Sequence, residues 1–405
     1  MYFMEKFAKR VLIVNKFYYA RGGDCVCTLN LETLLKSQGY EVAIYAMNYH
    51  ENISSEWTSY FASEVSFSGG VKNKIDAAKR LLGCGDIVKS FKKILDDFCP
   101  EVVHLQNIHS YLSPILAKMA KKRGAKVVWT LHDYKLLCPS YSCLRDGKPC
   151  ELCYTDKSQV LKKRCMKGSL VASVLAYLEA LRWNKAWLER YVDAFVCPSR
   201  FMAQKMAQGG FDKSKLHVIC NFVDPVKLDV LNNSRVGEKK DFYLYVGRLS
   251  AEKGVETLLE VASRLPYKLK IAGGGPLKEK LEAKYKDCVN IEFLGHCNAQ
   301  QVVELLAEAK FSVVPSEWYE NNPLSVIESL CAGTPVVGAN IGGIPELIDN
   351  GMTGYKFVSG IKEDLEIAIN KAFECNWDNS KIKEKSIERF SPERYFSEIK
   401  LIYGV

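Results

Sequence analysis

The chain has 405 residues, of which 48% are hydrophobic and 25% are charged. This length is enough for two domains, and the composition is that of a globular protein rather than a disordered chain. No apolar run approaches the roughly 18 residues that a membrane-spanning helix needs. The first ten residues also lack the pattern of a signal peptide. We therefore expect a cytoplasmic protein.

The charge is unevenly distributed along the chain. Residues 1–225 contain 33 Lys and Arg against 21 Asp and Glu, and residues 226–405 contain 23 against 26, which together give the net charge of +9. A basic first half indicates an anionic partner, and an anionic membrane surface or a lipid-phosphate acceptor fits this pattern. A solvated basic surface would explain the charge equally well. No basic-aromatic recognition motif indicates nucleic acid.

Short apolar segments alternate with amphipathic ones through the first half of the chain. We expect helices at 22–37, 86–98 and 114–123, and one long helix at 169–191. Buried strands are expected at 10–15, 41–45, 102–105, 126–131 and 193–197. This alternation predicts a parallel sheet with helices on both faces.

A polar segment at 228–241 predicts an interdomain linker between a first domain of residues 1–227 and a second of 242–390. Helix-start signals then mark 391–405 as a terminal helix. The second domain repeats the alternation, with strands expected at 241–247, 269–273, 290–294 and 311–315. Two doubly wound α/β domains would place substrates in the cleft between them, at the carboxyl ends of their strands.

The segment 313–328 runs from a buried strand through a polar loop into a helix and carries two carboxylates, Glu320 and Glu328. Pro323 suits the first helical position. The amides of Leu324 and Ser325 would then be free donors at the positive end of the helix dipole, which is a site for phosphate. One carboxylate near a sugar, one near a ribose and donors near a diphosphate describe a nucleotide-sugar pocket.

Other candidates for chemistry also follow strands. Arg248 ends the first strand of the second domain, and Lys253 lies in the next turn. Two cations beside a helix N-terminus can stabilise a developing phosphate charge without a metal ion. His132 ends a strand of the first domain and would face the cleft, where it could donate a hydrogen bond to a sugar hydroxyl.

Two glycine turns complete the candidates. Gly273 and Gly274 follow a strand and would allow close approach of the backbone to a ligand. Gly22 and Gly23 precede Asp24 at the start of a helix, where their amides could bind an anion. A tight turn or a helix-starting turn would explain these glycines as well.

The spacing Glu-x7-Glu is followed by Ala-Gly-Thr-Pro-Val-Val at 332–337 and Gly-Gly-Ile-Pro-Glu at 342–346. Together these motifs resemble the donor-site signature of retaining glycosyltransferases of family 4, which have the GT-B fold with two Rossmann-like domains facing a cleft. The resemblance extends over the whole chain. It implies that the terminal helix at 391–405 returns to the first domain.

The resemblance also implies roles for individual residues. Its implied catalytic set is Glu320, Arg248, Lys253 and His132. The implied donor-binding residues are Glu328, Gly273, Gly274, Asn322, Leu324 and Ser325, and the implied acceptor-side loop contains Gly22, Gly23 and Asp24. No Asp-x-Asp motif occurs in the chain, so we expect metal-independent transfer. The resemblance implies front-face attack, in which the departing phosphate helps to deprotonate the acceptor.

The implied reaction moves a hexose-type sugar from a UDP- or GDP-linked donor, with retention, to a lipid-linked or polysaccharide acceptor in cell-envelope synthesis. A GT-B nucleotide-sugar epimerase is one alternative. A non-catalytic protein that binds sugar nucleotides is another. The glycines 273–275 leave a dinucleotide-dependent oxidoreductase as a third, although Glu-x7-Glu has no role there.

Fifteen cysteines are distributed along the chain, and several of them fall in a polar and basic insertion at 138–165. Most are expected to be buried thiols rather than disulfides in a cytoplasmic protein. Cys150 and Cys153 have the spacing of zinc ligands, and Cys143 and Cys165 could complete a tetrahedral structural site. Free thiols, or a disulfide formed on oxidation, remain the alternatives.

Overall fold

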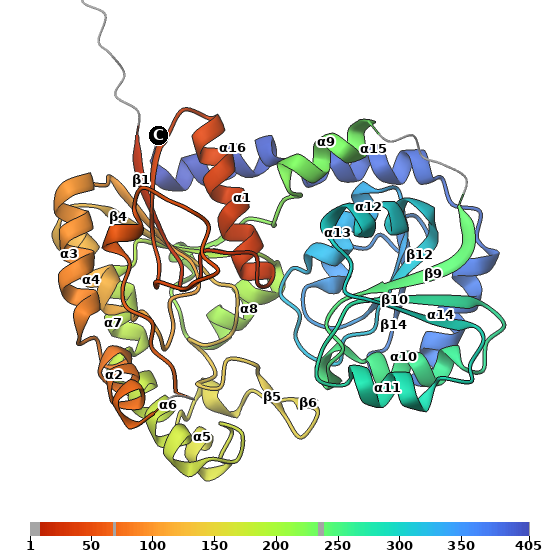
Figure 1. Ribbon diagram of the computed structural model, residues 1–405, viewed down its shortest axis with the longest axis horizontal. Helices are drawn as coiled ribbons and strands as arrows, with labels where there is room; N and C mark the ends of the chain where they lie inside the picture. The colour runs from red at the N-terminus through yellow and green to blue at the C-terminus, as the bar shows by residue number, and fades with distance from the viewer. Residues whose placement is uncertain (1–8, 68–69, 234–238, 405) are drawn as a thin grey trace, which may run out of the picture.

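The computed structural model describes residues 9–67, 70–233 and 239–404. The chain forms two domains that lie side by side, each built on a six-stranded sheet (Figure 1). All strand pairs of both sheets are parallel. The predicted pair of doubly wound α/β domains is therefore confirmed.

The first sheet has the strand order β2-β1-β3-β4-β7-β8. Its strands are β1 (Arg10–Val14), β2 (Glu41–Tyr45), β3 (Val102–Leu105), β4 (Lys126–Thr130), β7 (Ala194–Cys197) and β8 (Leu216–Val218). Residues 11–14 of β1 are all buried, which is why this part of the strand is a continuous apolar run. The structure adds β8, which the sequence pattern did not indicate.

Helices on both faces cover the first sheet, and one predicted helix is wrong. The expected long helix at 169–191 is two helices, because Asn184 interrupts it and caps the second helix by accepting a hydrogen bond from the Trp187 amide at 3.1 Å. The helices are α1 (Gly23–Ser37), α2 (Val71–Leu81), α3 (Asp86–Phe98), α4 (Ile115–Lys122), α5 (Gln159–Lys162), α6 (Leu170–Arg182), α7 (Lys185–Tyr191) and α8 (Arg200–Gln208).

The second sheet has the order β11-β10-β9-β12-β13-β14. Its strands are β9 (Lys240–Val246), β10 (Lys268–Ala272), β11 (Ile291–Gly295), β12 (Ala309–Val314), β13 (Val336–Ala339) and β14 (Gly354–Phe357). The helices of this half are α9 (Pro225–Asn233), α10 (Val255–Ala262), α11 (Lys278–Lys284), α12 (Ala299–Glu308), α13 (Leu324–Cys331), α14 (Lys362–Glu374), α15 (Asn379–Arg389) and α16 (Pro392–Tyr403).

In the described part of the segment expected as a linker, 228–241, most residues belong to a helix or a strand. The helix α9 extends to Asn233, and β9 begins at Lys240. Residues 234–238 lie outside the described residues. None of the described helices combines the length and apolar character needed to cross a membrane.

The last helix, α16, lies on the first domain (Figure 1). Its residues Tyr395 and Ile399 belong to the same hydrophobic core as Val11 and Ile13 of β1. The Tyr403 hydroxyl lies 2.6 Å from His104 Nδ1 on β3. The end of the chain therefore completes the core of the domain that begins it.

In both sheets the strand order reverses beside the first strand of the domain. The reversal lies between β1 and β3 in the first sheet and between β9 and β12 in the second. Ligands of such sheets bind outside the carboxyl ends of the strands at this point. Most of the residues predicted to act on substrate follow these strand ends. The candidate site is therefore centred on the two loops after β9 and β12.

Candidate active site

Glu320 lies in the loop between β12 and α13 and is 7% exposed. Its carboxylate accepts hydrogen bonds from Lys253 Nζ at 2.6 Å and from the Ser316 hydroxyl at 2.8 Å. Burial opposes ionisation, but Lys253 and these hydrogen bonds outweigh it and hold the pKa of Glu320 below its ordinary value. The carboxylate is therefore an ion at neutral pH.

A glycine allows Lys253 to reach this carboxylate. Gly254 has φ +67°, and a Cβ on it would lie 1.9 Å from the Pro315 carbonyl oxygen. The loop after β9 thus packs backbone against backbone on the loop after β12. The Lys253 ammonium also lies 5.2 Å from the centre of the Trp318 ring. The predicted residues Lys253 and Glu320 are brought together by this contact.

The Gly-Gly-Ile-Pro-Glu motif packs against the loop that carries Glu320. A Cβ on Gly342 would lie 2.2 Å from the Glu320 carbonyl oxygen, and one on Gly343 would lie 1.7 Å from that of Asn321. The Gly343 amide also donates to the Glu320 carbonyl at 2.7 Å. These glycines are required so that the turn after β13 can hold the loop that carries Glu320.

Arg248 follows β9 and is exposed. In the part of the chain that the structure describes, its guanidinium has no hydrogen bond or ion pair. It borders a cavity of about 260 Å³ whose lining includes Gly273, Gly274, His296 and Cys297. An unpaired cation beside an open cavity is available to an anionic ligand. His296 and Cys297 carry no sequence signal that marks them as part of a site.

The glycine turn after β10 has a structural explanation that the sequence did not reveal. Gly273 has φ +148°, and its Cβ would lie 1.9 Å from the Gly247 carbonyl oxygen. A Cβ on Gly275 would lie 2.5 Å from the Leu249 carbonyl oxygen. The close approach at these two positions is thus to the neighbouring loop. Only Gly274 faces open space, with no atom within 4 Å of an added Cβ.

The helix α13 begins one residue later than expected. Pro323 is its N-cap, with extended backbone at ψ 121°, and the first helical residue is Leu324. The Pro323 carbonyl already accepts from the Val326 amide at 3.1 Å. Within the described residues, the amides of Leu324 and Ser325 have no hydrogen-bond acceptor, as first-turn amides of a helix typically do not. They remain donors at the positive end of α13.

Glu328 on α13 forms an ion pair with Lys227 Nζ at 2.5 Å. Lys227 lies on α9, about a hundred residues away in the sequence. The side chain of Glu328 is 13% exposed. The carboxylate that we expected to accept hydrogen bonds from a ribose is thus ion-paired with a lysine that the sequence did not indicate.

Asn321 and Asn322 contact the first domain. Asn321 Nδ2 donates to the Leu131 carbonyl at 2.7 Å, and its Oδ1 accepts from the Ser199 hydroxyl at 2.9 Å. Asn322 Oδ1 accepts from the Asn221 amide at 3.0 Å. The implied donor-binding residue Asn322 therefore holds the domains together, and Asn321 places Glu320 beside the strand end that precedes His132.

Polar side chains meet at the carboxyl ends of β1, β3 and β4 in the first domain. Asp24 accepts from Asn107 Nδ2 at 2.7 Å. Burial opposes its ionisation, but His132, Lys16 and the Asn107 hydrogen bond hold the pKa of Asp24 below its ordinary value. Burial also lowers the pKa of the Lys16 ammonium. Lys16 and Asn107 complete a charged cluster that the sequence pattern indicated only through Asp24 and His132.

His132 is hydrogen-bonded within the first domain. Its Nε2 lies 2.6 Å from Gln106 Oε1. Since a carbonyl oxygen only accepts, Nε2 carries the proton in the neutral ring. Burial lowers the pKa of His132 and outweighs the carboxylates of Asp24 and Asp133, which raise it, so the neutral ring is favoured. In the structure the Nε2 proton is donated to Gln106 and Nδ1 is left as an acceptor, and the hydrogen bond from His132 to a sugar stays a prediction.

The acceptor-side loop starts α1 as expected. Gly22 is the N-cap, with extended backbone at φ −165°, and its carbonyl accepts from the Val26 amide at 3.0 Å. A Cβ on Gly23 would meet no atom within 4 Å. The first turn of α1 therefore begins at an open surface next to the cluster around Asp24.

The cysteine-rich insertion touches the loop of Glu320. The Tyr319 hydroxyl donates to Glu151 Oε1 at 2.8 Å, and the Lys205 ammonium lies 5.4 Å from the centre of the Tyr319 ring. The Tyr319 ring also packs on Phe201 of α8. The insertion thus borders the residue next to Glu320.

All fifteen cysteines are free thiols. In the insertion, Cys138 interacts through its thiol with Cys143 and Cys153, and all three are buried. Across the described residues, no group of three or more His, Cys, Asp or Glu side chains is arranged to hold a metal ion. Zinc binding by Cys143, Cys150, Cys153 and Cys165 stays a prediction, and Cys138, which that set omits, is the thiol at the centre of the cluster.

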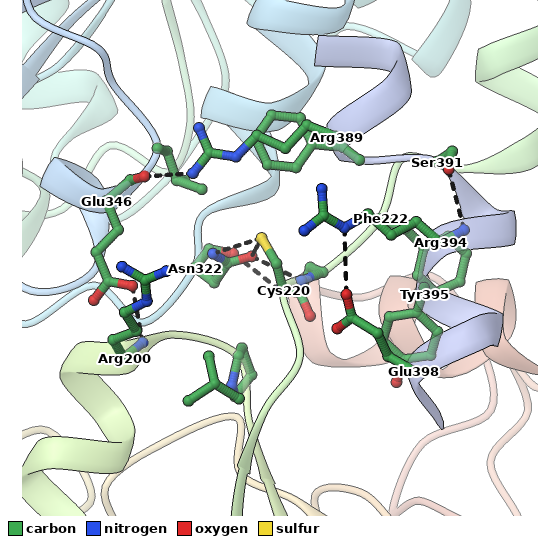
Figure 2. A pocket seen from close by; sticks show the side chains of 15 residues that line it. Arg200, Cys220, Phe222, Asn322, Glu346, Arg389, Ser391, Arg394, Tyr395 and Glu398 are labelled. Carbon is green, nitrogen blue, oxygen red and sulfur yellow. Dashed lines mark hydrogen bonds and ion pairs between the residues drawn. The ribbon is translucent and has the colours of Figure 1, made fainter. Parts of the chain in front are cut away.

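A second cavity, of about 340 Å³, lies where the two domains join (Figure 2). The Glu346 carboxylate accepts there from the amides of Arg200 and Phe201, at 2.8 and 2.6 Å. Arg389 donates to the Glu346 carbonyl at 2.6 Å. Asn322 is the one predicted site residue in the lining of this cavity. Glu346, the last residue of the Gly-Gly-Ile-Pro-Glu motif, is therefore an interdomain anchor on the N-terminus of α8.

Both halves of the chain match known families. Residues 21–227 match a family described as Glycosyltransferase Family 4, and residues 229–389 match one described as Glycosyl transferases group 1. The chain belongs to the family 4-like glycosyltransferases of the GT-B type. The two matched segments correspond to the two halves of the molecule that supply the walls of the site.

Relatives of this glycosyltransferase include a protein of a cps region and an O-antigen biosynthesis glycosyltransferase. It is 27% identical to an uncharacterized 42.6 kDa protein in the cps region of Klebsiella pneumoniae, over 83% of this chain and 87% of the relative. It is 30% identical to the O-antigen biosynthesis glycosyltransferase WbnH of Escherichia coli, over 53% of this chain and 61% of that protein.

Solved structures confirm the fold. The glycosyltransferase superposes on the lipopolysaccharide outer core galactosyltransferase WaaB with a TM-score of 0.64 at 18% identity, over 97% of this chain and 98% of that one. It superposes on Anabaena HepE in complex with UDP and glucose with a TM-score of 0.62 at 15% identity, over 97% and 98% of the two chains. The GT-B architecture expected from the sequence is therefore confirmed.

Proposed function

We propose that this glycosyltransferase transfers a hexose-type sugar, with retention of anomeric configuration, from a UDP- or GDP-linked donor to a lipid-linked or polysaccharide acceptor in cell-surface polysaccharide synthesis. The observation that carries the proposal is the placement of three charged groups in the two loops after β9 and β12. Glu320 is ion-paired with Lys253, and the unpaired Arg248 follows the same strand as Lys253. Both loops lie where the strand order of the second sheet reverses.

These groups fit the parts of a nucleotide-sugar donor. Arg248, Lys253 and the first-turn amides of α13 would bind the diphosphate, because guanidinium, ammonium and helix N-termini all favour phosphate. The carboxylate of Glu320 would accept from hydroxyls of the sugar. Glu328 would accept from the ribose after exchanging part of its contact with Lys227.

The state of Glu320 supports electrostatic rather than proton-transfer chemistry. Its carboxylate is ionised and held by Lys253 and Ser316. A buried anion near the sugar would stabilise positive charge as the glycosidic bond breaks, and the two cations would stabilise the departing diphosphate. This division of charge suits front-face transfer, in which the leaving phosphate takes the acceptor proton.

The first domain would supply the acceptor side. His132 presents Nδ1 as an acceptor because Nε2 is bonded to Gln106. Asp24 and Lys16 lie in the same cluster. Such a wall can orient a hydroxyl through hydrogen bonds without a histidine acting as a general base. The role in surface polysaccharides is supported by the names of the relatives WbnH and the protein in the cps region.

Calorimetric titration with UDP, GDP and NADH tests the donor site. We expect one of the two nucleoside diphosphates to bind, and Arg248→Gln to weaken that binding about tenfold or more, as the loss of a charge-assisted hydrogen bond does. Glu328→Gln should also weaken it. Arg264→Gln is the matched control, because Arg264 is exposed in the same domain and its guanidinium donates only to the Glu260 carbonyl among the described residues.

Binding of NADH alone would contradict the proposal and indicate an oxidoreductase. Binding of UDP or GDP that is equally strong in wild type, Arg248→Gln and Glu328→Gln would show that the nucleotide lies elsewhere. Retention is tested separately, by the anomeric configuration of the product in an NMR spectrum.

A further inference from the structure

The helix α6 has an unusual outer face. Five of its large apolar side chains are exposed, in fractions of 39 to 71%. Four of them recur at spacings of three and four residues, which places them along one stripe of a helix. The five residues are Leu170, Val171, Val174, Leu178 and Leu181.

The other face of α6 is buried and contains its only carboxylate. Ser173, Ala176 and Glu179 are 0, 3 and 4% exposed. Glu179 pairs with Lys135 at 2.8 Å. The outer face therefore carries apolar side chains and the exposed Arg182, but no acidic group. A helix that is apolar on both faces is expected to be covered on both, and contiguous exposed apolar surface usually marks an interaction site.

A basic segment leads into the exposed end of this stripe. Lys162, Lys163, Arg164 and Lys167 all lie within six residues and are exposed. Lys162 pairs with Asp156 at 3.1 Å. The other three cations have no carboxylate partner among the residues that the structure describes. The helix α5, which contains Lys162, packs against α6 (Figure 1).

The apolar surface continues past the other end of α6. Trp183 Nε1 donates to the Leu81 carbonyl at 2.7 Å, which joins the end of α6 to the end of α2. Leu82, the next residue, is 41% exposed, and Ile75 of α2 is 50% exposed. The surface thus extends over two helices at one edge of the first domain, where Figure 1 places α2, α5 and α6 together.

We propose that this surface, the outer face of α6 with the basic segment 162–167, seats the protein on an anionic lipid bilayer. The stripe would enter the boundary between headgroups and acyl chains, with α6 in the plane of the interface. The three unpaired cations would contact anionic headgroups. A second copy of the chain would bring cations against cations, because this surface contains no exposed carboxylate on α6. The inference does not rest on the proposed sugar transfer.

Vesicle co-sedimentation at low salt tests this inference. We expect binding to vesicles of phosphatidylcholine mixed with phosphatidylglycerol, and little to phosphatidylcholine alone. The variant Lys163→Gln/Arg164→Gln/Lys167→Gln should partition about a hundredfold less, since each cation near an anionic surface contributes about fivefold. The variant Val171→Asn/Val174→Asn/Leu178→Asn/Leu181→Asn should lose binding. The matched control is Val289→Asn/Ile367→Asn, which changes exposed apolar residues of the second domain and should bind like wild type.

Wild-type protein that stays in the supernatant with anionic vesicles would overturn the inference. Equal binding of wild type and the four-residue asparagine variant would overturn it as well. A dimer in light scattering that this variant converts to a monomer, without vesicle binding by wild type, would assign the surface to a second copy. The thermal unfolding midpoint checks the fold of each variant. Nucleotide affinity is not used for that check, so the result is separate from that of the donor-site titration.

Discussion

The ion pair of Glu320 and Lys253 determines the chemistry that the site can support. The two charged atoms are 2.6 Å apart, and the Glu320 side chain is 9% exposed. Breaking such a pair leaves a buried charge without a partner, which costs more than the pair contributes. The same pair also holds in place the Lys253 ammonium, which we propose binds the diphosphate of the donor. Stability and activity therefore depend on the same contact.

Lys253→Met removes the ammonium and keeps most of the side-chain volume. We expect turnover to fall at least about a hundredfold, as for loss of a charge that stabilises a leaving group. The free energy of unfolding should fall by about 3 kcal/mol, because Glu320 is left buried and unpaired. Urea unfolding measures the second effect. The double variant Lys253→Met/Glu320→Gln should recover part of the stability but none of the activity. A double variant no more stable than Lys253→Met would contradict this reading of the pair.

The ion pair also predicts a pH dependence. Because the pKa of Glu320 is lowered in the folded protein, its contribution to stability is complete above the unfolded value of about 4.3 and is lost as the pH falls through the lower folded value. In Lys253→Met, the charge that does most to lower the pKa of Glu320 is removed while burial still raises it, so this pKa should be higher than in wild type. The stability loss on acidification should then begin at higher pH than in wild type. Urea midpoints measured between about pH 3 and pH 7 test this, and identical curves would contradict it.

At the scale of elements, the site is built by contacts between loops. Sequence patterns predict strands well, but they do not predict which loops contact each other. Apolar runs such as that of β1 were correctly predicted because both faces of the strand are buried. The helix at 169–191 was predicted as continuous because periodicity does not show the cap at Asn184. The turn at Gly273 was interpreted either as a close approach to a ligand or as a tight turn, and the pattern did not show that its backbone approaches Gly247. Such pairings join distant segments and leave no local signal.

Gly254→Ala tests the loop contact that positions Lys253. The new Cβ would meet the Pro315 carbonyl at 1.9 Å, with the backbone at φ +67°. We expect a loss of more than about 3 kcal/mol and a large loss of turnover, because the loop must shift. Gly39→Ala is the matched control, since Gly39 has φ +78° but no atom within 4 Å of a Cβ. The control should lose about 1 kcal/mol for the left-handed backbone and retain its activity. Equal losses for the two variants would show that the contact with Pro315 is unimportant.

At the scale of the whole molecule, distant segments make contacts that no single segment predicts. Lys227 pairs with Glu328, and Glu346 binds the first turn of α8 across the domain boundary. The sequence indicated Glu328 as a site residue and Glu346 only as the end of a motif. It indicated neither partner, because the partners lie about a hundred residues away or more. The last helix similarly completes the first core through Tyr403 and His104. The fold followed from repeated patterns, and the resemblance located one wall of the site.

Tyr403→Phe tests the return of the chain to the first domain. Both ring nitrogens of His104 are paired, with Tyr403 at 2.6 Å and Thr130 at 2.7 Å, and burial lowers its pKa to about 3. Without the hydroxyl, a buried nitrogen lacks a partner, so we expect a loss of about 1 to 3 kcal/mol in urea unfolding. Tyr40→Phe is the control, because the Tyr40 ring packs on Phe396 of α16 while its hydroxyl has no hydrogen bond among the described residues. Equal effects of the two changes would contradict this role of the Tyr403 hydroxyl.

The most direct test of the account is sugar transfer itself, measured with radiolabelled UDP- and GDP-sugars and a lipid extract as acceptor. We predict acceptor-dependent release of nucleotide and label in the lipid or polysaccharide fraction. Glu320→Gln should reduce the rate at least about a hundredfold. Glu317→Gln, three residues away with its carboxylate bonded to the Thr257 hydroxyl, should be close to wild type. Conversion of the donor without an acceptor, as by an epimerase, or binding of the donor without turnover would contradict the account.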